Sequence, residues 1–439
     1  MHTARLLGLG LLTGALLLVA CGEDEDGNGK GSDPSAPPSG SLVAAFGTDG
    51  IVAGNPSSSW DQPTGVALDA THMYVVGFDA TLGSSDDQWR IEKRSLDDGA
   101  LDPSFGTAGV IQTNPGTGTD WIWAIALDAT SLYVGGWDKS PGDLQWRVEK
   151  RSLSDGALDA GFGTGGVVTS NPTGAADSLA AMLVESDGLY LVGSSEGDSR
   201  IEKRSTATGA LVTAFGAGGV VVPDPDTYYD LASAVATDGR NLFIAGRDQS
   251  LGAGDWSLRI EKRSLATGAL DAAFGAGGTV TSSPSPTYDA GSAIAYGDGW
   301  IYIAGTDEGP GAGDRQFRIE KRSAIDGTLD PAFGAAGAVT QDLGAGDEEF
   351  LSIVLDADFL YAGGTDESSG DGQWNLQKRR RSDGSLVDSF GSGGLVTENL
   401  SPYWDGIEEI AVDAAGLYVV GAACEAVDDG AWRIEKRVK

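Results

Sequence analysis

The sequence contains very little cysteine and histidine, which limits the chemistry that it can support. Two Cys and two His occur among 439 residues, and His2 and Cys21 lie at the N-terminus, so that only His72 and Cys424 remain in the rest of the chain. A disulfide framework is therefore unavailable, and a histidine-based catalytic triad or zinc site is nearly excluded. The sequence also contains no Gly-x-Ser-x-Gly elbow, phosphate-binding loop or metalloprotease helix motif.

Positive charge is scarce as well. The chain has 29 Lys and Arg against 64 Asp and Glu, which gives a formal net charge of −35 at pH 7. Phosphate binding requires clustered Lys and Arg, so we expect no nucleic-acid partner. A charge of this sign favours solubility, cations or basic partners.

One long apolar run, Leu6–Ala20, follows the positively charged Arg5 at the N-terminus. It is too short to span a membrane comfortably and has the length of an export signal, which we place at residues 1–20. Its end, Leu18-Val19-Ala20-Cys21, resembles the lipobox of bacterial lipoproteins. The resemblance implies cleavage before Cys21 and lipidation of that residue, hence a membrane partner through a lipid anchor.

Residues 21–40 are rich in Gly, Ser, Pro and acids, a composition that predicts a flexible linker. Gly22 follows the lipidated residue, where some bacteria place an Asp to retain a lipoprotein in the inner membrane. We therefore expect the bacterial cell envelope as the location, with the outer membrane or the cell surface favoured over the inner membrane.

The remainder, residues 41–439, repeats one unit seven times. The sequence Trp89-Arg90-Ile91-Glu92-Lys93-Arg94-Ser95 recurs with a period of roughly 57 residues. Each unit also carries a Phe-Gly pair, a short apolar run ending near an acid, and a Leu-Tyr-Val-Val-Gly type run. The runs are short, rich in β-branched and aromatic residues, and bounded by Gly, Asp and Ser, which is typical of four antiparallel strands per unit.

Seven four-stranded units predict an all-β fold, a seven-bladed β-propeller. Residues 41–47 correspond to the tail of a unit, and the chain stops just after the last copy of the repeated motif, so the N-terminal segment is expected to complete the last blade. The alternative architecture is an open β-solenoid, which would more naturally end in polar caps.

The pattern Gly-Ala-Leu-Asp-Pro-Ser-Phe-Gly at residues 99–106, followed by Gly109-Val110 and by Leu132–Gly136, resembles the delta-60 repeat family of bacterial surface proteins. The resemblance covers residues 41–439. It implies a propeller and leaves function open, because no activity is generally assigned to that family.

The repeated charged motif is predicted to be structural. Alternation along a strand places Arg90, Glu92 and Arg94 on one side, as an Arg–Glu–Arg ladder between blades, and Lys93 on the other, with its ammonium in water. Seven copies would give seven equivalent sites, whereas an active site is normally one asymmetric constellation. The sixth unit loses Arg and Glu together at Asn375 and Gln377, which indicates paired loss in a ladder.

Candidate ligand-binding residues lie in the loops before the innermost strands, which should ring one mouth of the central channel. One acid recurs there in every unit: Asp61, Asp120, Asp177, Asp230, Asp289, Glu348 and Asp405. A second series precedes the charged motif: Asp86, Asp143, Asp198, Asp255, Asp314, Asp371 and Asp429. Both series should lie on one strongly negative face. Each Asp is expected to cap its own turn, and binding of a hard cation such as calcium is the alternative.

Aromatic residues beside the first series vary between units, as expected of a contact surface for a protein or glycan. The alternative interpretation is that they pack between blades. They are Trp60, Trp121, Trp123, Tyr228, Tyr229, Tyr288, Tyr403 and Trp404. Closure of the ring would bring Trp60 and Asp61 next to Trp404 and Asp405, and Tyr228, Tyr229 and Tyr288 would form a second cluster.

The leading hypothesis is therefore a non-enzymatic binding or scaffold module without a cofactor, which binds a protein or glycan through an acidic, aromatic face. One alternative is a glycan hydrolase or lyase, because that chemistry needs only two carboxylates. The other is a calcium-stabilised scaffold.

Overall fold

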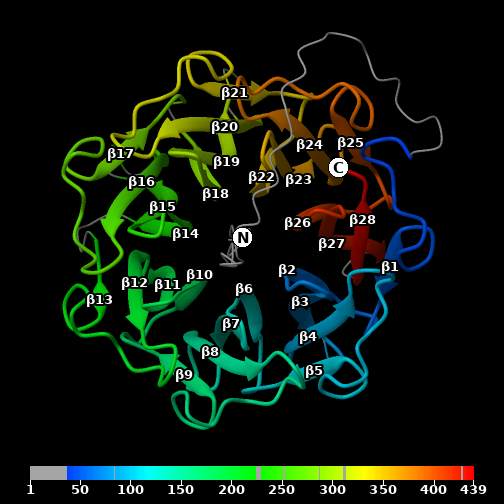
Figure 1. Cartoon of the computed structure of the whole chain (residues 1–439), viewed down its shortest axis with the longest axis vertical. Coiled ribbons are helices and arrows are strands. Elements are labelled where there is room, and N and C mark those ends of the chain that lie inside the picture. Colours follow the sequence, from blue (N-terminus) through cyan, green and yellow to red (C-terminus); the bar gives the residue numbers. More distant parts are fainter. Residues whose placement is uncertain are drawn as a thin grey trace, which may run out of the picture.

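A computed structural model describes residues 37–439, apart from residues 84, 224–228, 250, 253, 286, 310–312 and 427–428. The predicted signal at residues 1–20, Cys21, most of the linker and Tyr228 lie outside the described residues. The described part forms seven four-stranded antiparallel sheets arranged around a central axis (Figure 1). The predicted seven-bladed propeller is thereby confirmed, and no helix is present among the described residues.

In blades 1 to 6 the four strands run from innermost to outermost in chain order, and in blade 7 the outermost strand is β1. Blade 1 contains β2 (Gln62–Leu68), β3 (His72–Asp79), β4 (Gln88–Ser95) and β5 (Val110–Thr113); blade 2 contains β6 (Trp121–Leu127), β7 (Ser131–Asp138), β8 (Gln145–Ser152) and β9 (Val167–Ser170). Blade 3 contains β10 (Asp177–Glu185), β11 (Gly188–Ser195), β12 (Asp198–Arg204) and β13 (Val220–Val221); blade 4 contains β14 (Asp230–Thr237), β15 (Asn241–Asp248), β16 (Ser257–Ser264) and β17 (Thr279–Ser282).

Blade 5 contains β18 (Asp289–Gly297), β19 (Trp300–Glu308), β20 (Arg315–Ser323) and β21 (Ala338–Gln341); blade 6 contains β22 (Glu348–Leu355), β23 (Phe359–Asp366), β24 (Gln373–Arg380) and β25 (Leu395–Glu398). Blade 7 contains β26 (Asp405–Val412), β27 (Leu417–Ala426), β28 (Asp429–Arg437) and β1 (Ile51–Gly54).

The two ends of the chain meet in blade 7, as the sequence predicts. β1 is the outermost strand of this blade and pairs with β28 in the register Ile51↔Glu435 (Figure 1). The ordered contacts begin slightly before residue 41: the Gly40 N–H donates to the Val438 carbonyl at 2.8 Å. Ring closure therefore joins residues that are nearly 400 positions apart in the sequence.

The innermost strand of every blade contains a β-bulge, and the bulge explains a repeated glycine. In blade 2 the register shifts between Ile122 and Ala124. A Cβ atom on Gly136, which pairs with Ile122, would lie 1.9 Å from the Trp121 carbonyl oxygen. The Leu-Tyr-Val-Val-Gly type runs therefore end in Gly because a side chain there would collide with the bulged strand.

The ladder of the repeated motif is present. In blade 1, Arg90 Nε and Arg94 Nε donate to the two carboxylate oxygens of Glu92 at 2.8 and 2.7 Å. The Arg90 guanidinium lies 5.6 Å from the centre of the Trp432 ring in blade 7. The motif's tryptophan reaches the other way, since Trp89 Nε1 donates to the Trp137 carbonyl in blade 2 at 3.4 Å. The motif therefore holds each blade to both neighbours.

One prediction about this motif is wrong. The Lys93 ammonium lies 2.8 Å from an Asp102 carboxylate oxygen, and the lysine side chain is only 8% exposed. Asp102 belongs to the loop that leads to the outermost strand, 9 residues further along the chain. The lysine is therefore a buried ion-pair partner and does not extend into water.

Candidate functional site

Two sets of loops form one face of the propeller, which we call face A. They are the loops that precede the innermost strands and the loops between the second and third strands. Contacts between the sets confirm that they lie together: Asn114 donates to Asp86 at 3.3 Å, and the Asp120 N–H donates to the Asp87 carbonyl at 3.2 Å. The opposite face, face B, is formed by the remaining loops.

The first acid series is located before the innermost strands, as expected, but its side chains are buried. Asp61 is 0% exposed, and it accepts hydrogen bonds from the Ser57 N–H at 2.7 Å and from the Ala80 N–H at 2.8 Å. Asp405 accepts in the same way from the N–H groups of Ser401 and Cys424. These acids cap turns and tie the two loops of face A together. The geometry therefore supports the turn-capping interpretation.

Burial gives several of these carboxyl groups a pKa close to neutral. It raises the pKa of Asp120 to about 6 and that of Asp289 to about 7, each with a further increase from the neighbouring carboxylate, Asp138 or Asp307. Burial raises the pKa of Glu348 to about 8, with Asp366 as the next cause. Asp289 and Glu348 pair with Asp307 and Asp366 directly across the two inner strands, so that two acids share one covered position.

The second acid series is half-buried and joins neighbouring blades. Asp143 accepts a hydrogen bond from Asn171 at 3.2 Å, and Asp371 accepts one from Asn399 at 3.1 Å. In each of these pairs the Asn lies in the next loop before an innermost strand, and the same pair recurs as Asn55 with Asp429 and Asn114 with Asp86. These acids therefore also take part in hydrogen bonds that hold neighbouring blades together.

Among the described residues, no group of three or more His, Cys, Asp or Glu side chains is arranged to hold a metal ion. Cys424 is 2% exposed, and burial raises the pKa of its thiol to about 12, which is unfavourable for a nucleophile. His72 lies at the start of β3, 3.6 Å from Asp102.

The predicted aromatic cluster at the junction of blades 7 and 1 exists. The rings of Trp60 and Trp404 lie 5.8 Å apart at an angle of 39°, and both residues are half-buried. Trp60 Nε1 donates to Gln62 at 2.9 Å. A cavity of about 560 Å³ opens between the two face A loops of blade 1, lined by Pro56, Ser57, Ser58, Ser59, Ala80, Thr81, Leu82 and Gly83.

The second predicted cluster takes a different form. Tyr288 lies between the guanidinium groups of Arg247 and Arg315, 5.4 and 5.2 Å from the ring centre. Tyr229 lies against Gly197 instead, and its side chain is 58% exposed. The two tyrosines therefore do not contact each other, because arginines on β15 and β20 occupy the space around Tyr288.

A third aromatic cluster was only partly visible in the sequence. Trp121, Trp123 and Trp137 form a triangle with ring centres 5.3 to 5.7 Å apart, and Phe78 stacks on Trp121 at 4.6 Å. Trp121 and Trp137 face each other across β6 and β7. The signal that could have identified Trp137 is its position directly before Asp138, where blade 1 has Phe78.

Face A also carries exposed apolar side chains. Among the described residues of its loops, five large apolar side chains are exposed: Leu82, Val222, Tyr229, Leu251 and Leu343. Three occur on face B: Leu158, Leu270 and Ile325. All five residues of face A lie in loops whose sequences differ from blade to blade, which is where a partner-specific surface is expected.

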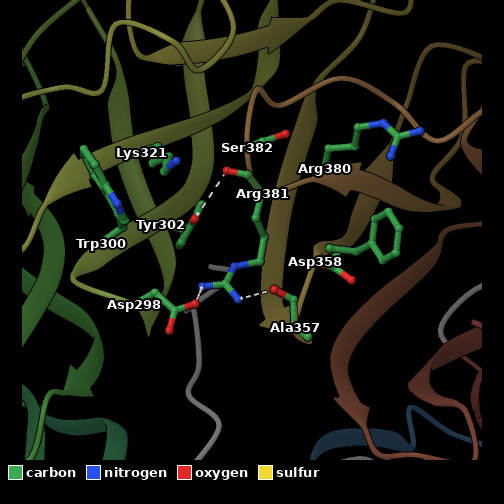
Figure 2. A pocket seen from close by; sticks show the side chains of 10 residues that line it. Asp298, Trp300, Tyr302, Lys321, Ala357, Asp358, Arg380, Arg381 and Ser382 are labelled. Carbon is green, nitrogen blue, oxygen red and sulfur yellow. Dashed lines mark hydrogen bonds and ion pairs between the residues drawn. The ribbon is translucent and has the colours of Figure 1, made fainter. Parts of the chain in front are cut away.

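A second cavity, of about 480 Å³, opens on face B between blades 5 and 6 (Figure 2). Sequence reasoning missed it. Its lining residues are Asp298, Trp300, Tyr302, Lys321, Ala357, Asp358, Phe359, Arg380, Arg381 and Ser382. The available signal was the run Arg379-Arg380-Arg381, which departs from every other copy of the repeated motif.

Comparison with known proteins adds little beyond the fold. No protein-family model and no curated protein matches the chain. Among solved structures, the WD40 β-propeller domain of Doa1 is 13% identical with a TM-score of 0.46, covering 88% of this chain and 96% of that one. Sqt1 from Chaetomium thermophilum is 12% identical with a TM-score of 0.44, covering 88% of this chain and all of that one. Residues 37–439, where described, contain no helix that could cross a membrane.

Proposed function

We propose that the chain is a non-catalytic binding module that recognises a partner protein through face A and is held at the bacterial cell envelope by a lipid on Cys21. The observation that carries the proposal is the set of exposed apolar side chains on the loops of face A. Leu82, Tyr229 and Leu251 are each more than half exposed, at 52, 58 and 59%. Exposure of apolar groups of this size to water is unfavourable, and binding of a partner that covers them is therefore favourable.

A protein partner fits this face better than a glycan. Sugar rings stack on accessible aromatic faces, whereas the rings of Trp60 and Trp404, and those of the Trp121 cluster, cover one another; among the described aromatic residues beside the first acid series, Tyr229 is the exposed one. The exposed residues Leu82 and Leu251 are aliphatic. With a net charge of −35 on the chain, the complementary surface is apolar with a basic rim.

The hydrolase or lyase alternative gains no support from the geometry. It requires two carboxylates that face a cleft, and the first acid series is buried and hydrogen-bonded within its own blades. The calcium alternative needs clustered oxygen ligands, and the described acids form no such cluster.

The envelope location rests on the lipobox-like sequence Leu18-Val19-Ala20-Cys21 and on the polar residues 22–40 that follow it. Several acyl chains on Cys21 would give stable anchoring without a membrane-spanning segment. The repeated Gly-Ala-Leu-Asp-Pro-Ser-Phe-Gly type pattern supports a relationship to the delta-60 repeat proteins, and Gly22 favours the outer membrane.

The binding surface is tested with matched substitutions on the two faces of the full-length protein. Leu82→Asp with Tyr229→Asp removes apolar surface from face A, and Ile325→Asp, at a position 75% exposed on face B, is the control. Envelope proteins captured by each variant are quantified by mass spectrometry after crosslinking in the source cells. We expect the face A variant to lose a partner that the control retains. Equal capture by all variants would contradict the proposal.

The anchor is tested separately by cell fractionation. Cys21→Ser removes the atom that carries the lipid, so we expect the protein to leave the membrane fraction while its propeller remains folded. Retention of Cys21→Ser in washed membranes would show that the lipid is not the anchor.

A further inference from the structure

The face B cavity between blades 5 and 6 is formed where two departures from the repeat meet. Arg381 stands where other blades have Leu96, Leu153 or Leu265. Gly297 stands where other blades have an acid such as Asp69 or Asp128. These two residues are in contact, because a Cβ atom on Gly297 would lie 2.5 Å from Arg381 Nη2. The missing side chain in blade 5 therefore makes room for the added guanidinium of blade 6.

The protein holds the Arg381 guanidinium firmly. Nη1 donates to the carbonyls of Asp356 and Ala357, both at 2.8 Å, and the guanidinium carbon lies 5.6 Å from the centre of the Tyr302 ring. Figure 2 shows the side chain extending between Asp298 on one side and Ala357 on the other. A positive group fixed in this way needs no further ordering when it binds an anion.

One nitrogen of this guanidinium, Nη2, is held only by a weak ion pair. Arg381 Nη2 donates to Asp298 Oδ2 at 2.8 Å, yet the Asp298 side chain is 83% exposed. An ion pair with so exposed a carboxylate contributes little to stability. The Asp298 carboxylate thus marks where an anion binds, and a ligand can replace it at small cost.

The cavity brings three basic side chains, Lys321, Arg380 and Arg381, next to two acidic ones, Asp298 and Asp358. Lys321 is already paired with Asp330 at 2.7 Å, but Arg380 forms no ion pair with any described residue. Burial lowers the pKa of the nearby Lys378, Asp356 raises it, and Lys439 and Arg380 lower it. Arg380 and Arg381 are balanced by the acids Asp298 and Asp358 in the lining, so an anionic ligand is favoured where it replaces the Asp298 carboxylate on Arg381.

The remaining walls are not those of a simple phosphate or sulfate site. Trp300 and Phe359 are half-buried, and each has a lysine ammonium over its ring, Lys321 at 4.6 Å and Lys378 at 4.2 Å, so their contribution is the remaining ring surface. Asp358 and Ser382 are exposed at the rim and can accept hydrogen bonds from hydroxyl groups. In the view of Figure 2, Trp300 and Lys321 lie on one side of Arg381, and Arg380 lies on the other. A ligand that uses all of these walls carries a carboxylate, several hydroxyls and an apolar ring face.

We propose that this cavity binds a carboxylate-bearing sugar, a hexuronate unit of an acidic glycan, with its carboxylate replacing Asp298 on Arg381. The volume of about 480 Å³ lies within the range of small-molecule sites. Arg380 contributes a second positive charge, and the sugar hydroxyls bond to Asp298, once released, and to Asp358. The site is independent of the partner surface on face A.

The test measures binding of D-glucuronate to the full-length protein by calorimetry, with D-glucose, L-glutamate and inorganic phosphate as comparison probes. We expect glucuronate to bind, glucose to bind at least about tenfold more weakly because a charge-assisted bond is missing, and glutamate and phosphate to bind more weakly as well. Glucose binding as tightly as glucuronate would overturn the role of the carboxylate. Glutamate or phosphate binding as tightly would overturn the sugar.

Two variants move the affinity in opposite directions. Arg381→Leu introduces the residue that blades 1, 2 and 4 have at this position, and we expect at least about a tenfold loss of glucuronate affinity. Asp298→Asn removes the competing carboxylate and retains the turn, since Asn-Gly is a preferred two-residue hairpin sequence; we expect tighter binding by about threefold. If Arg381→Leu does not fold, Asp298→Asn is compared with the wild type. Unchanged or weaker binding of glucuronate by Asp298→Asn overturns the proposal.

Discussion

Replacing Glu149 with Gln should strongly destabilise the propeller. The Glu149 side chain is fully buried and receives Arg147 Nη2 at 2.7 Å and Arg151 Nη2 at 2.6 Å. A neutral amide can accept from one arginine only, and its NH₂ group would face a donor of the other. Leaving buried positive charge uncompensated costs about 3–5 kcal/mol in the free energy of unfolding.

Blade 6 shows how the loss can be reduced. There Asn375, Gln377 and Arg379 replace the Arg–Glu–Arg ladder, with Gln377 Nε2 donating to Asn375 at 3.0 Å and Arg379 Nε donating to Gln377 at 2.8 Å. The double variant Arg147→Asn with Glu149→Gln reproduces this neutral chain of hydrogen bonds. We expect it to recover about 1–2 kcal/mol relative to Glu149→Gln alone. Recovery is incomplete because the contact of Arg147 with the Trp89 ring is lost.

The assay is urea-induced unfolding of the wild type, both single variants and the double variant, followed by circular dichroism. The midpoints are compared at an unchanged dependence on denaturant, so that differences report stability. A cost below about 1 kcal/mol for Glu149→Gln would refute the reasoning, since a buried ladder must cost more than an exposed ion pair. A double variant no more stable than Glu149→Gln would refute the paired-loss argument.

Three further outcomes are expected. Burial raises the pKa of Glu348 to about 8 in the folded state, whereas an exposed Glu has a pKa of about 4.3, so the group destabilises the fold increasingly from about pH 4 to pH 8 and constantly above that; Glu348→Gln should make stability less dependent on pH in this window and increase it by about 1–3 kcal/mol at pH 9, measured by unfolding at several pH values. Trp60→Ala and Trp404→Ala should each lower stability by at least about 1 kcal/mol, because the rings are half-buried and stack on each other; unchanged melting would show that they do not pack. Gly136→Ala should destabilise by at least about 2 kcal/mol, whereas Gly54→Ala, with no atom within 4 Å of the new Cβ, should be nearly neutral; equal effects on the unfolding midpoint would contradict the bulge argument.

The fold could be predicted because the same pattern of four strands recurs seven times in the sequence. Each copy supplies the same strands, and the start and end of the chain together make one complete blade, which β1 and β28 confirm. The same repetition identified the Arg–Glu–Arg ladder, since alternation along one strand determines which side chains share a side. The period of the repeat was sufficient for the ring, and the alternation within one strand was sufficient for the ladder.

The arrangement of side chains between loops could not be predicted in this way. Asp61 was correctly placed before an innermost strand, but its burial depends on the Ala80 N–H, 19 residues further along, which no local pattern reveals. Tyr229 and Tyr288 were expected to meet, and Arg247 and Arg315 keep them apart. Lys93 was expected in water, and Asp102 draws it into an ion pair. In each case the partner belongs to another loop or strand.

Repetition also gives a physical way to separate scaffold from function in this protein. A group present in all blades must satisfy the same contacts seven times, as the turn-capping acids do, whereas a departure persists only if its neighbour departs too. Gly297 and Arg381 satisfy that condition across 84 positions of sequence: a Cβ atom on Gly297 would lie 2.5 Å from Arg381 Nη2 and 2.9 Å from a methyl carbon of Leu355. The two changes together add a fixed positive group on face B. Blade 7 also has a positive residue at this position, Lys439, but there blade 6 retains the acid, and Asp356 lies 3.8 Å from the ammonium. A fixed guanidinium without that acid distinguishes the junction of blades 5 and 6 from the junction of blades 6 and 7, and the former is the place where anion binding should be sought.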